Sequence, residues 1–190
     1  MRCTLTPRYL IALLLLCSGC VSSTTDRGFI SLFNGKDLTG WRYKTEAPLN
    51  GKKEASDGRY TALNGTLVVN DFDKARGPHL RQLWTLESFT GNFILRLEFR
   101  AAVNADSGIF IREPQLQCRD YLVAGPYKDL KKYRAQDWNS IEVIVRDGVA
   151  HCTCNGEILQ EALKLPATGP IGLEADHGQM EYRRIRLKRL

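Results

Sequence analysis

Short runs of alternating apolar and polar residues dominate the chain from residue 29 onward. The clearest run is FILRLEFR at 93–100, where every odd position is apolar and the even positions 96, 98 and 100 are charged. A period of two places the apolar side chains on one face of a β-strand and the charged ones on the other. Further runs of strand length lie at 60–63, 66–70, 107–112, 141–145, 149–154, 169–175 and 182–187. The one helical candidate, 127–134, is short and charged and favours a loop with a helical turn.

Asn-Gly and Asp-Gly dipeptides separate many of these runs, as at 64–65, 147–148 and 155–156. Such pairs favour tight hairpin turns, because Asn, Asp and Gly tolerate the positive φ that these turns require. Many short strands at hairpin spacing predict an all-β antiparallel sandwich or jelly roll rather than alternating β-α units. No long linker, low-complexity stretch or internal repeat divides residues 27–190, so one domain is expected over 28–190.

The first 19 residues have the pattern of an export signal. Arg2 and Arg8 precede an apolar stretch at 9–16, which is too short to span a bilayer and ends in the small residues of Cys-Ser-Gly-Cys. Small residues before Cys20 resemble a bacterial lipobox, although Cys17 stands where the pattern prefers Leu. The expectation is a signal peptide at 1–19, lipidation of Cys20 and a polar tether at 20–27.

This amino terminus predicts a protein of the cell envelope, lipid-anchored in the periplasm or at the outer membrane or cell surface, with ordinary secretion as the alternative. Loss of the two signal arginines lowers the formal net charge from +6 to +4. The contents of 25% charged and 43% hydrophobic residues are ordinary for a globular domain. A disordered chain, a coiled coil and a multi-span membrane protein are therefore not expected, and no basic and aromatic stripe points to a nucleic-acid partner.

Three cysteines remain after the lipobox: Cys118, Cys152 and Cys154. Cys152 and Cys154 are two residues apart in an expected strand and so point to the same face, which makes Cys118 the better disulfide partner for one of them. A zinc site is a weaker alternative, because no second ligand pair lies nearby. No pattern indicates a cofactor, and the sequence does not decide whether a divalent metal is needed.

Four segments, taken together, resemble one domain family. They are FISLFNGKDLTGW at 29–41, the run 93–112 ending in DSGIFIR, Trp138-Asn139 with Asn155-Gly156, and GPIGLEADHG at 169–178 with EYRRIR at 181–186. In order and spacing they are similar to the 3-keto-disaccharide hydrolase domain family over nearly the whole mature chain. The resemblance implies a concanavalin A-like or laminin G-like β-jelly-roll. It also implies an exported hydrolase that acts on glycosides already oxidised at C3 of a glucose-type ring.

Two positions depart from the family pattern. Gln115 begins QLQCRD where the family usually has Glu-x-Gln-x-x-Asp, and Glu174 replaces a glutamine in the family's Leu-Gln-x-His-Gly. If the lost carboxylate is catalytic, this copy is altered or inactive, whereas Glu174 would restore a charge nearby. The Gln115 departure supports the alternative function, a non-catalytic carbohydrate-binding module on the same fold.

A ketone at C3 acidifies the C2 proton, whose loss expels the C1 substituent before water adds. Such a site needs a base, a cation or hydrogen-bond donor for the enolate oxygen, and an acid for the leaving group. From the matched segments, His177 and Asp176 are candidates for acid and base, Glu98 for a second carboxylate and Arg112 for the enolate clamp.

Gln117, Asp120 and Glu174 are candidates for binding sugar hydroxyls. All of these assignments assume that the polar faces of 93–100 and 169–175 line one sheet. His79 and His151 lie outside the matched motifs and are interpreted as surface or packing residues. The Glu-x-Asp-x-x-Glu motif of β-glucan hydrolases on this fold is absent from the sequence.

Overall fold

The computed structural model describes residues 27–123 and 125–190, which form thirteen β-strands and no α-helix. The strands are β1 (Ile30–Ser31), β2 (Trp41–Tyr43), β3 (Tyr60–Leu63), β4 (Thr66–Val69), β5 (Arg81–Thr90), β6 (Phe93–Ala101), β7 (Gly108–Ile111), β8 (Gln115–Gln117), β9 (Asn139–Arg146), β10 (Val149–Cys154), β11 (Glu157–Lys164), β12 (Thr168–Ala175) and β13 (Met180–Arg189). The expected signal segment and Cys20 lie outside the described residues. Within those residues, no helix is long and apolar enough to cross a membrane.

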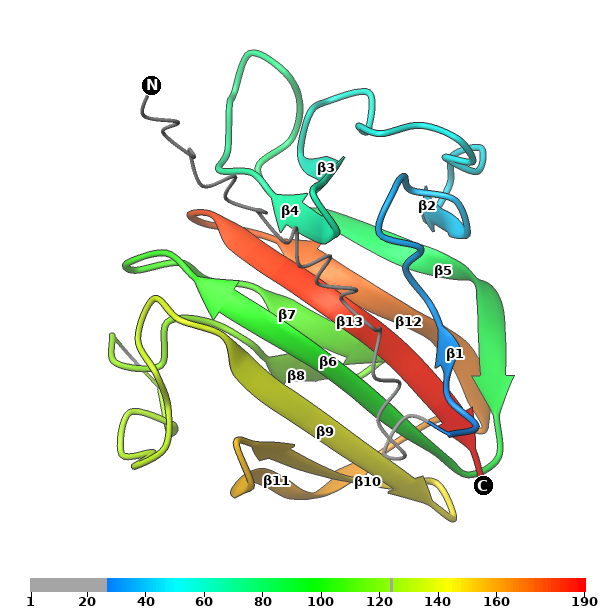
Figure 1. Cartoon of the computed structure of the whole chain (residues 1–190), viewed down its shortest axis with the longest axis vertical. Coiled ribbons are helices and arrows are strands. Elements are labelled where there is room, and N and C mark those ends of the chain that lie inside the picture. The colour runs from blue at the N-terminus through cyan, green and yellow to red at the C-terminus, as the bar shows by residue number, and fades with distance from the viewer. Residues whose placement is uncertain (1–26, 124) are drawn as a thin grey trace, which may run out of the picture.

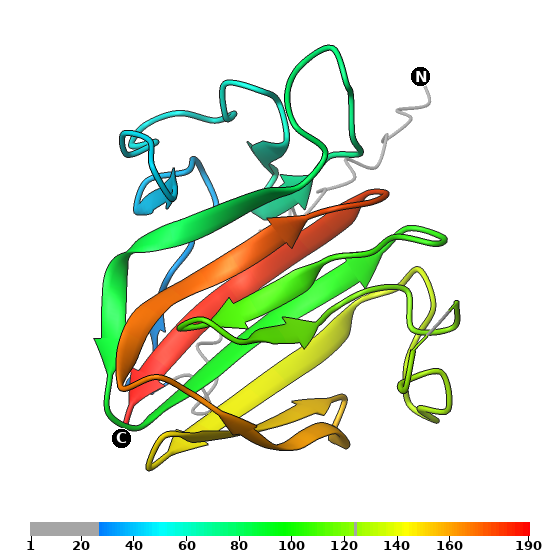
Figure 2. The ribbon, with the colours of Figure 1, turned by 180° about the vertical axis from the view of Figure 1, so that it is seen from behind.

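The strands form two antiparallel sheets that face each other (Figures 1 and 2). Sheet A has the order β11-β10-β9-β6-β13-β4-β3, with β1 also paired to β13. Sheet B has the order β2-β5-β12-β7-β8. This arrangement confirms the all-β antiparallel sandwich expected from the hydrophobic pattern.

Hairpin turns with positive φ connect neighbouring strands of sheet A, as the dipeptides predicted. The pairs Asn64/Gly65, Asp147/Gly148 and Asn155/Gly156 have φ values of 50° and 80°, 48° and 77°, and 50° and 80°, respectively. Positive φ at both central residues is the backbone of a type I′ turn, whose twist matches that of the strands it joins.

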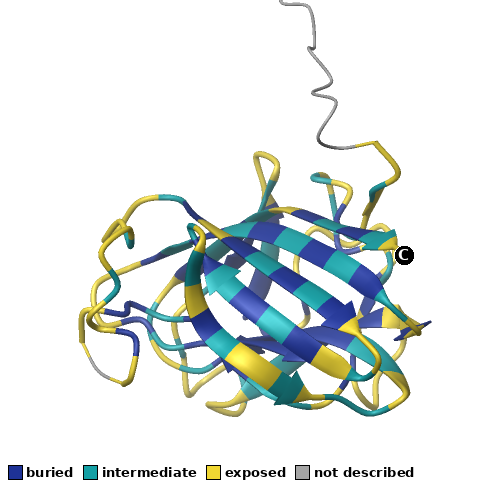
Figure 3. Ribbon diagram, turned by 90° about the horizontal axis from the view of Figure 1, so that it is seen from below, coloured by how far each residue is buried: buried dark blue, intermediate teal, exposed yellow. Residues whose placement is uncertain are grey.

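The core lies between the inner faces of the two sheets. In β6 the four odd residues of 93–99 are at most 1% exposed, and the intervening residues are half-buried. Figure 3 shows the same alternation as bands along the strands. Sheet B contributes Leu83, Ile109, Ile171 and Leu173, all fully buried. Each such side chain contributes about 1.5–3 kcal/mol on leaving water, so the packing of the two inner faces holds the sandwich together.

The hydrophobic pattern does not reveal β5, the longest strand of sheet B. Its pairing with β12 shifts register between Pro170 and Gly172, and residues 86–88 are exposed next to buried ones. A bulge of this kind interrupts the two-residue period on which the prediction depends. A second irregularity in register lies between Arg183 and Arg186 of β13, where Arg184 has a φ of 52°.

Strands β6 and β12 belong to different sheets, so the expectation that 93–100 and 169–175 line one polar face is wrong. Both strands direct their apolar residues into the shared core. Their polar faces therefore point in opposite directions, away from each other.

The expected disulfide is also absent among the described residues. Cys118, Cys152 and Cys154 are free thiols, and all are buried. Burial raises the pKa of Cys152 and of Cys154 to about 12, which keeps both thiols protonated and unreactive.

We predict that a thiol-alkylating reagent labels none of these three cysteines in the folded protein and all three after unfolding without reductant. Mass spectrometry of the labelled peptides makes the measurement. A cysteine that becomes labelled only after reduction would contradict the free-thiol arrangement.

Candidate active site

The outer face of sheet B carries a row of side chains that crosses all five strands. Cross-strand register places Arg42 beside Trp84, Trp84 beside Gly172, Gly172 beside Phe110, and Phe110 beside Gln115. Because Leu173 and Leu116 point into the core, their neighbours along each strand face outward. The sequence therefore exposes aromatic and polar groups together on this face.

An aromatic pair occupies the middle of the row. The Trp84 and Phe110 rings have centroids 5.0 Å apart at an interplanar angle of 35°. Trp84 lies across Gly172, where a Cβ would approach the indole ring to 2.7 Å. Glycine at 172 thus allows the ring to lie against the sheet, and the pair forms a low apolar platform on an otherwise polar face.

Glu174 follows two residues further along β12, on the same face. The Gln115 amide donates a hydrogen bond to its carboxylate. Gln115 reaches Glu174 by lying over Gly108, because a Cβ at that glycine would overlap the Gln115 amide. The two positions that depart from the family pattern are therefore direct partners in space.

Glu174 as a whole residue is only 7% exposed. Burial raises its pKa, the hydrogen bond from Gln115 lowers it, and the charges of Asp176 and Asp106 raise it further. The net shift is upward. A carboxyl in this environment retains its proton at higher pH than an exposed one, which is the property of an acid-base group.

Asp106 and Arg119 lie on the side of Glu174 nearest β8. Gln117 donates to the Asp106 carboxylate and, over 3.1 Å, to the Ser107 carbonyl. Arg119 Nη1 lies 2.9 Å from Asp106 Oδ2, while its buried Nε–H has no partner among the described residues. Arg119 is thus paired with Asp106, one of the two carboxylates whose charges raise the pKa of Glu174.

His79 and Asp176 form a second polar pair near Glu174. His79 Nδ1 lies 3.4 Å from Asp176 Oδ1, and both side chains are partly exposed. Arg59 holds the two loops together, since its Nη2 donates to the carbonyls of both residues at 3.0 Å. His79, interpreted from the sequence as a surface or packing residue, therefore stands beside a predicted site residue.

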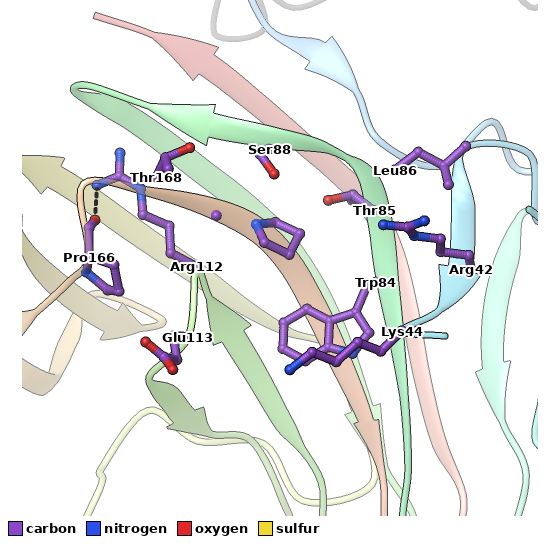
Figure 4. A pocket seen from close by; sticks show the side chains of 12 residues that line it. Arg42, Lys44, Trp84, Thr85, Leu86, Ser88, Arg112, Glu113, Pro166 and Thr168 are labelled. Atoms are coloured by element: carbon purple, nitrogen blue, oxygen red, sulfur yellow. Dashed lines mark hydrogen bonds between the residues drawn. The ribbon is translucent and has the colours of Figure 1, made fainter. Parts of the chain in front are cut away.

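Arg112 does not reach this cluster. Its Nε, Nη1 and Nη2 donate to the carbonyls of Phe89 (2.9 Å), Pro166 (2.8 Å) and Gly91 (2.6 Å), as Figure 4 shows for Pro166. Burial lowers the pKa of Arg112. Arg112 thus links three segments of the chain. These contacts give no support to the predicted role of Arg112 in binding the enolate oxygen.

Glu98 lies on the outer face of sheet A, on the opposite side of the sandwich. Its carboxylate binds Arg183 at 2.6 Å and Arg184 at 3.0 Å. Asp120 is buried and accepts hydrogen bonds from Asn104 N at 3.1 Å and Gln136 Nε2 at 3.2 Å. Glu98 thus stabilises sheet A and Asp120 stabilises a loop. Neither residue belongs to the cluster around Glu174.

His177 is exposed at the end of β12, and its backbone pairs with that of Asp106. The pKa of Asp71 is lowered, mainly by hydrogen bonds from the backbone of Phe72 and Gly178. The charge of His177 adds to this shift, so His177 lies near Asp71. The structure thus brings together Glu174, Asp176 and Gln117 of the predicted residues. The role of His177 stays a prediction.

Several members of the cluster were missed by the sequence reasoning: Asp106, Arg119, His79, Trp84 and Phe110. Asp106 is part of the matched DSGIFIR run, and no role was assigned to it from the sequence. Arg119 alternates with positions 115 and 117, a signal that could have placed it on the same face.

A cleft of about 350 Å³ adjoins Trp84 and Pro170, on the side of Gly172 away from Glu174 along β12. Figure 4 shows the side chains that line it. Its lining residues are Arg42, Lys44, Trp84, Thr85, Leu86, Ser88, Arg112, Glu113, Pro166, Thr168, Gly169 and Pro170. Trp84 therefore forms a wall of the cleft as well as part of the platform. Among residues 27–123 and 125–190, no cluster of three or more His, Cys, Asp or Glu side chains is placed to hold a metal ion.

Comparison with known proteins finds both a family and a fold. The model of the 3-keto-alpha-glucoside-1,2-lyase-like domain matches residues 28–188. A putative glycosyl hydrolase from Parabacteroides distasonis ATCC 8503 is 18% identical, with a TM-score of 0.66 over 87% of this chain and 96% of that one. No curated protein sequence matches the chain.

More distant structures share the same architecture. The β-glucanase of Bacillus licheniformis is 9% identical, with a TM-score of 0.54 over 85% of this chain and 97% of that one. The carbohydrate binding module CBM66 from Bacillus subtilis is 8% identical, with a TM-score of 0.50 over 80% and 98%. At these identities the likeness shows the fold alone, and it confirms the expected jelly-roll sandwich.

We predict that Glu174→Gln stabilises the protein at pH 7. Folding raises the pKa of Glu174, so its favourable contribution is complete below the ordinary value of 4.5 and is lost as pH rises through the raised pKa. Removing the charge should therefore add about 0.5–2 kcal/mol at pH 7, with the gain shrinking toward pH 4. Thermal unfolding across this pH range makes the measurement.

Glu98→Gln is the matched control, because its carboxylate is stabilised by two arginines. That variant should be equal to or less stable than the wild type at pH 7. A Glu174→Gln protein less stable than the wild type at pH 7 would contradict the environment described for this carboxyl.

Proposed function

The chain belongs to the 3-keto-alpha-glucoside-1,2-lyase-like domain family, and on this premise we propose that it cleaves glycosides whose glucose ring carries a ketone at C3. It is a carbohydrate-active jelly-roll protein. In the proposed reaction a base removes the C2 proton, the C1–O bond breaks and the leaving oxygen takes a proton. Water then adds to the resulting enone, with its oxygen at C1 and a proton at C2. The sum of the two steps is hydrolysis.

Glu174 is the proposed proton-transfer group. The observation that carries the proposal is a buried carboxyl with a raised pKa on the outer face of sheet B. A raised pKa makes the carboxylate a stronger base toward the C2 proton. In an α-glucoside the C2–H and C1–O bonds lie on opposite faces of the ring, so Glu174 is the proposed base at C2 and a second donor protonates the leaving oxygen.

Arg119 is proposed to stabilise the enolate oxygen at C3, the role that the sequence assigned to Arg112. A guanidinium next to a carboxyl with few water neighbours favours a developing negative charge without reorganisation at the moment of reaction. The support is its ion pair with Asp106, a carboxylate whose charge acts on Glu174. Gln117 and the pair of His79 with Asp176 would bind ring hydroxyls.

Trp84 and Phe110 expose only 8% and 9% of their surface on the outer face of sheet B, and this small apolar area is the proposed contact for the sugar ring. A pyranose stacked there would lie beside Glu174, because Gly172 and Glu174 are two residues apart on β12 and so roughly 7 Å apart. Orientation of this kind supplies part of the catalytic effect by holding the C2 proton near its acceptor.

The contact between Gln115 and Glu174 favours the interpretation that this protein is an active member of its family. The resemblance implies Glu at the first position and Gln at the second, and this chain has the two exchanged. Since the side chains bind each other, the exchange keeps one carboxyl and one amide in the same small volume. A binding module needs no such buried charge, because burial of a carboxylate costs stability.

We also propose that the protein is exported and anchored through a lipid on Cys20. This would place the site in the envelope, where oxidised sugars from outside the cell arrive. The support is the basic and apolar amino terminus followed by the lipobox-like Cys-Ser-Gly-Cys.

We predict that Glu174→Gln lowers kcat on a 3-keto-α-glucoside by about 10²–10⁴, the usual contribution of general acid-base catalysis, with little change in KM. The exchanged variant Gln115→Glu/Glu174→Gln should recover part of the lost activity, because it returns a carboxyl to the same contact. Release of the leaving group, measured against the unoxidised glucoside as a blank, makes the comparison.

Unchanged turnover by Glu174→Gln would remove this residue from the mechanism, and His177→Ala then tests the histidine predicted from sequence. If the wild type binds the 3-keto-glucoside without cleaving it, the protein is a binding module.

We predict that Cys20→Ala abolishes membrane attachment when the whole chain is expressed in a bacterium. The thiol of Cys20 is the proposed acylation site, so mass spectrometry should find an acylated amino-terminal peptide in the wild type and none in this variant. Cys17→Ala is the control and should keep the lipid. Membrane attachment of the Cys20→Ala protein would contradict the lipoprotein proposal.

A further inference from the structure

We propose that the cleft beside Trp84 is the leaving-group subsite and that it selects a leaving group with a negative charge. The inference rests on the proposed function, since it assigns the second half of the substrate to a place next to Glu174. It names a substrate class: 3-keto-glucosides whose aglycone carries a carboxylate or a phosphate.

The cleft lies in line with the candidate acid-base group. Pro170, Gly172 and Glu174 all face outward on β12, and each step of two residues covers roughly 7 Å. Pro170 lines the cleft, Gly172 supports the Trp84 ring and Glu174 carries the buried carboxyl. A sugar ring on the platform with C1 directed toward the cleft would therefore place its substituent inside the cleft.

The charges along this line have opposite signs at its two ends. Asp106, Glu174 and Asp176 gather at one end, and their proximity is evident because two of them raise the pKa of the third. Arg42 and Lys44 stand on the wall of the cleft beside Trp84, whereas Glu113 lies across the cleft from them (Figure 4). An anionic group is therefore repelled from the acidic end and attracted to the basic wall, which fixes the direction in which a substrate lies.

Arg42 and Lys44 are available for a ligand. Both side chains are exposed, and within the described part of the chain neither forms an ion pair or a side-chain hydrogen bond. Two other arginines in or next to sheet B are paired with carboxylates: Arg81 with Glu46 and Asp57, and Arg119 with Asp106. The free pair thus marks the cleft as the basic part of this face.

The cleft also suits a ring with hydroxyls. Its volume of about 350 Å³ falls at the small end of ligand pockets and fits one ring rather than a polymer. The exposed residues Ser88 and Thr168 line it, and their hydroxyls can donate and accept hydrogen bonds with a ligand.

The test compares two substrates that differ only in charge, 4-carboxyphenyl and 4-carbamoylphenyl 3-keto-α-glucoside. The full-length wild type should favour the carboxylate about tenfold in kcat/KM, the effect of one charge-assisted contact. Arg42→Gln/Lys44→Gln should abolish this preference. The control Lys52→Gln/Lys53→Gln removes two exposed charges outside the cleft and should retain it. Comparing the same pair across variants cancels the different reactivity of the two leaving groups.

A binding measurement separates this inference from the proposed function. The corresponding thioglycosides without the ketone, which undergo no elimination, should bind with the same preference and the same response to Arg42→Gln/Lys44→Gln in calorimetric titrations. If neither ketone is cleaved but this pattern of binding holds, the proposed function fails and the anionic subsite stands. If cleavage occurs with no charge preference, or if the preference survives Arg42→Gln/Lys44→Gln in both assays, the subsite is refuted.

The identity of the anion follows from two further titrations. Free glucuronate and glucose 6-phosphate offer a carboxylate and a phosphate on the same ring, and glucose is the neutral reference. The inference is supported if glucuronate or glucose 6-phosphate binds more tightly than glucose and if this difference is lost in Arg42→Gln/Lys44→Gln. The anion that binds more tightly then shows whether the cleft prefers a carboxylate or a phosphate. Equal binding of all three would overturn it.

Discussion

The packing of two apolar sheet faces is the constraint from which the site of this protein follows. Ile171, Leu173 and Ala175 of β12 are fully buried between the sheets. Since side chains alternate across a strand, burial of these residues obliges Gly172 and Glu174 to face outward. A register slip of one residue would place the Glu174 carboxyl in the core, so the hydrophobic energy that holds the sandwich together also keeps the candidate site in position.

The outward face is not simply a solvated surface, because neighbouring side chains cover its central residues. Trp84 and Phe110 are at most 9% exposed although they lie outside the core, and Glu174 is 7% exposed. Gly172 and Gly108 make this second layer feasible, since each leaves the space that Trp84 or Gln115 fills. Burial in this layer raises the pKa of the Glu174 carboxyl. Burial of a carboxylate costs folding stability, and side-chain packing alone would not favour it.

The contact between Gln115 and Glu174 gives a physical meaning to two departures that look unrelated in the sequence. The positions are 59 residues apart, and they meet because β7 stands between β8 and β12 with a glycine at the crossing point. In a pair of this kind either member can carry the charge while the other donates the hydrogen bond. The polarity of the face, acidic near Glu174 and basic near Arg42, then gives a bound substrate a direction.

The sequence by itself determined the sandwich, most strand positions and the type I′ turns. The alternation of apolar and polar residues and the tolerance of Asn, Asp and Gly for positive φ are both visible within a few consecutive residues. It also pointed to Asp176, Gln117 and Glu174. It placed Glu98 on one face with 169–175, which the structure separates, and left β5 undetected. The residue pattern of a strand shows neither the sheet to which the strand belongs nor a bulge such as the one opposite Ile171. Only the tertiary structure could decide which polar faces point the same way and which charges lie close enough to act on each other.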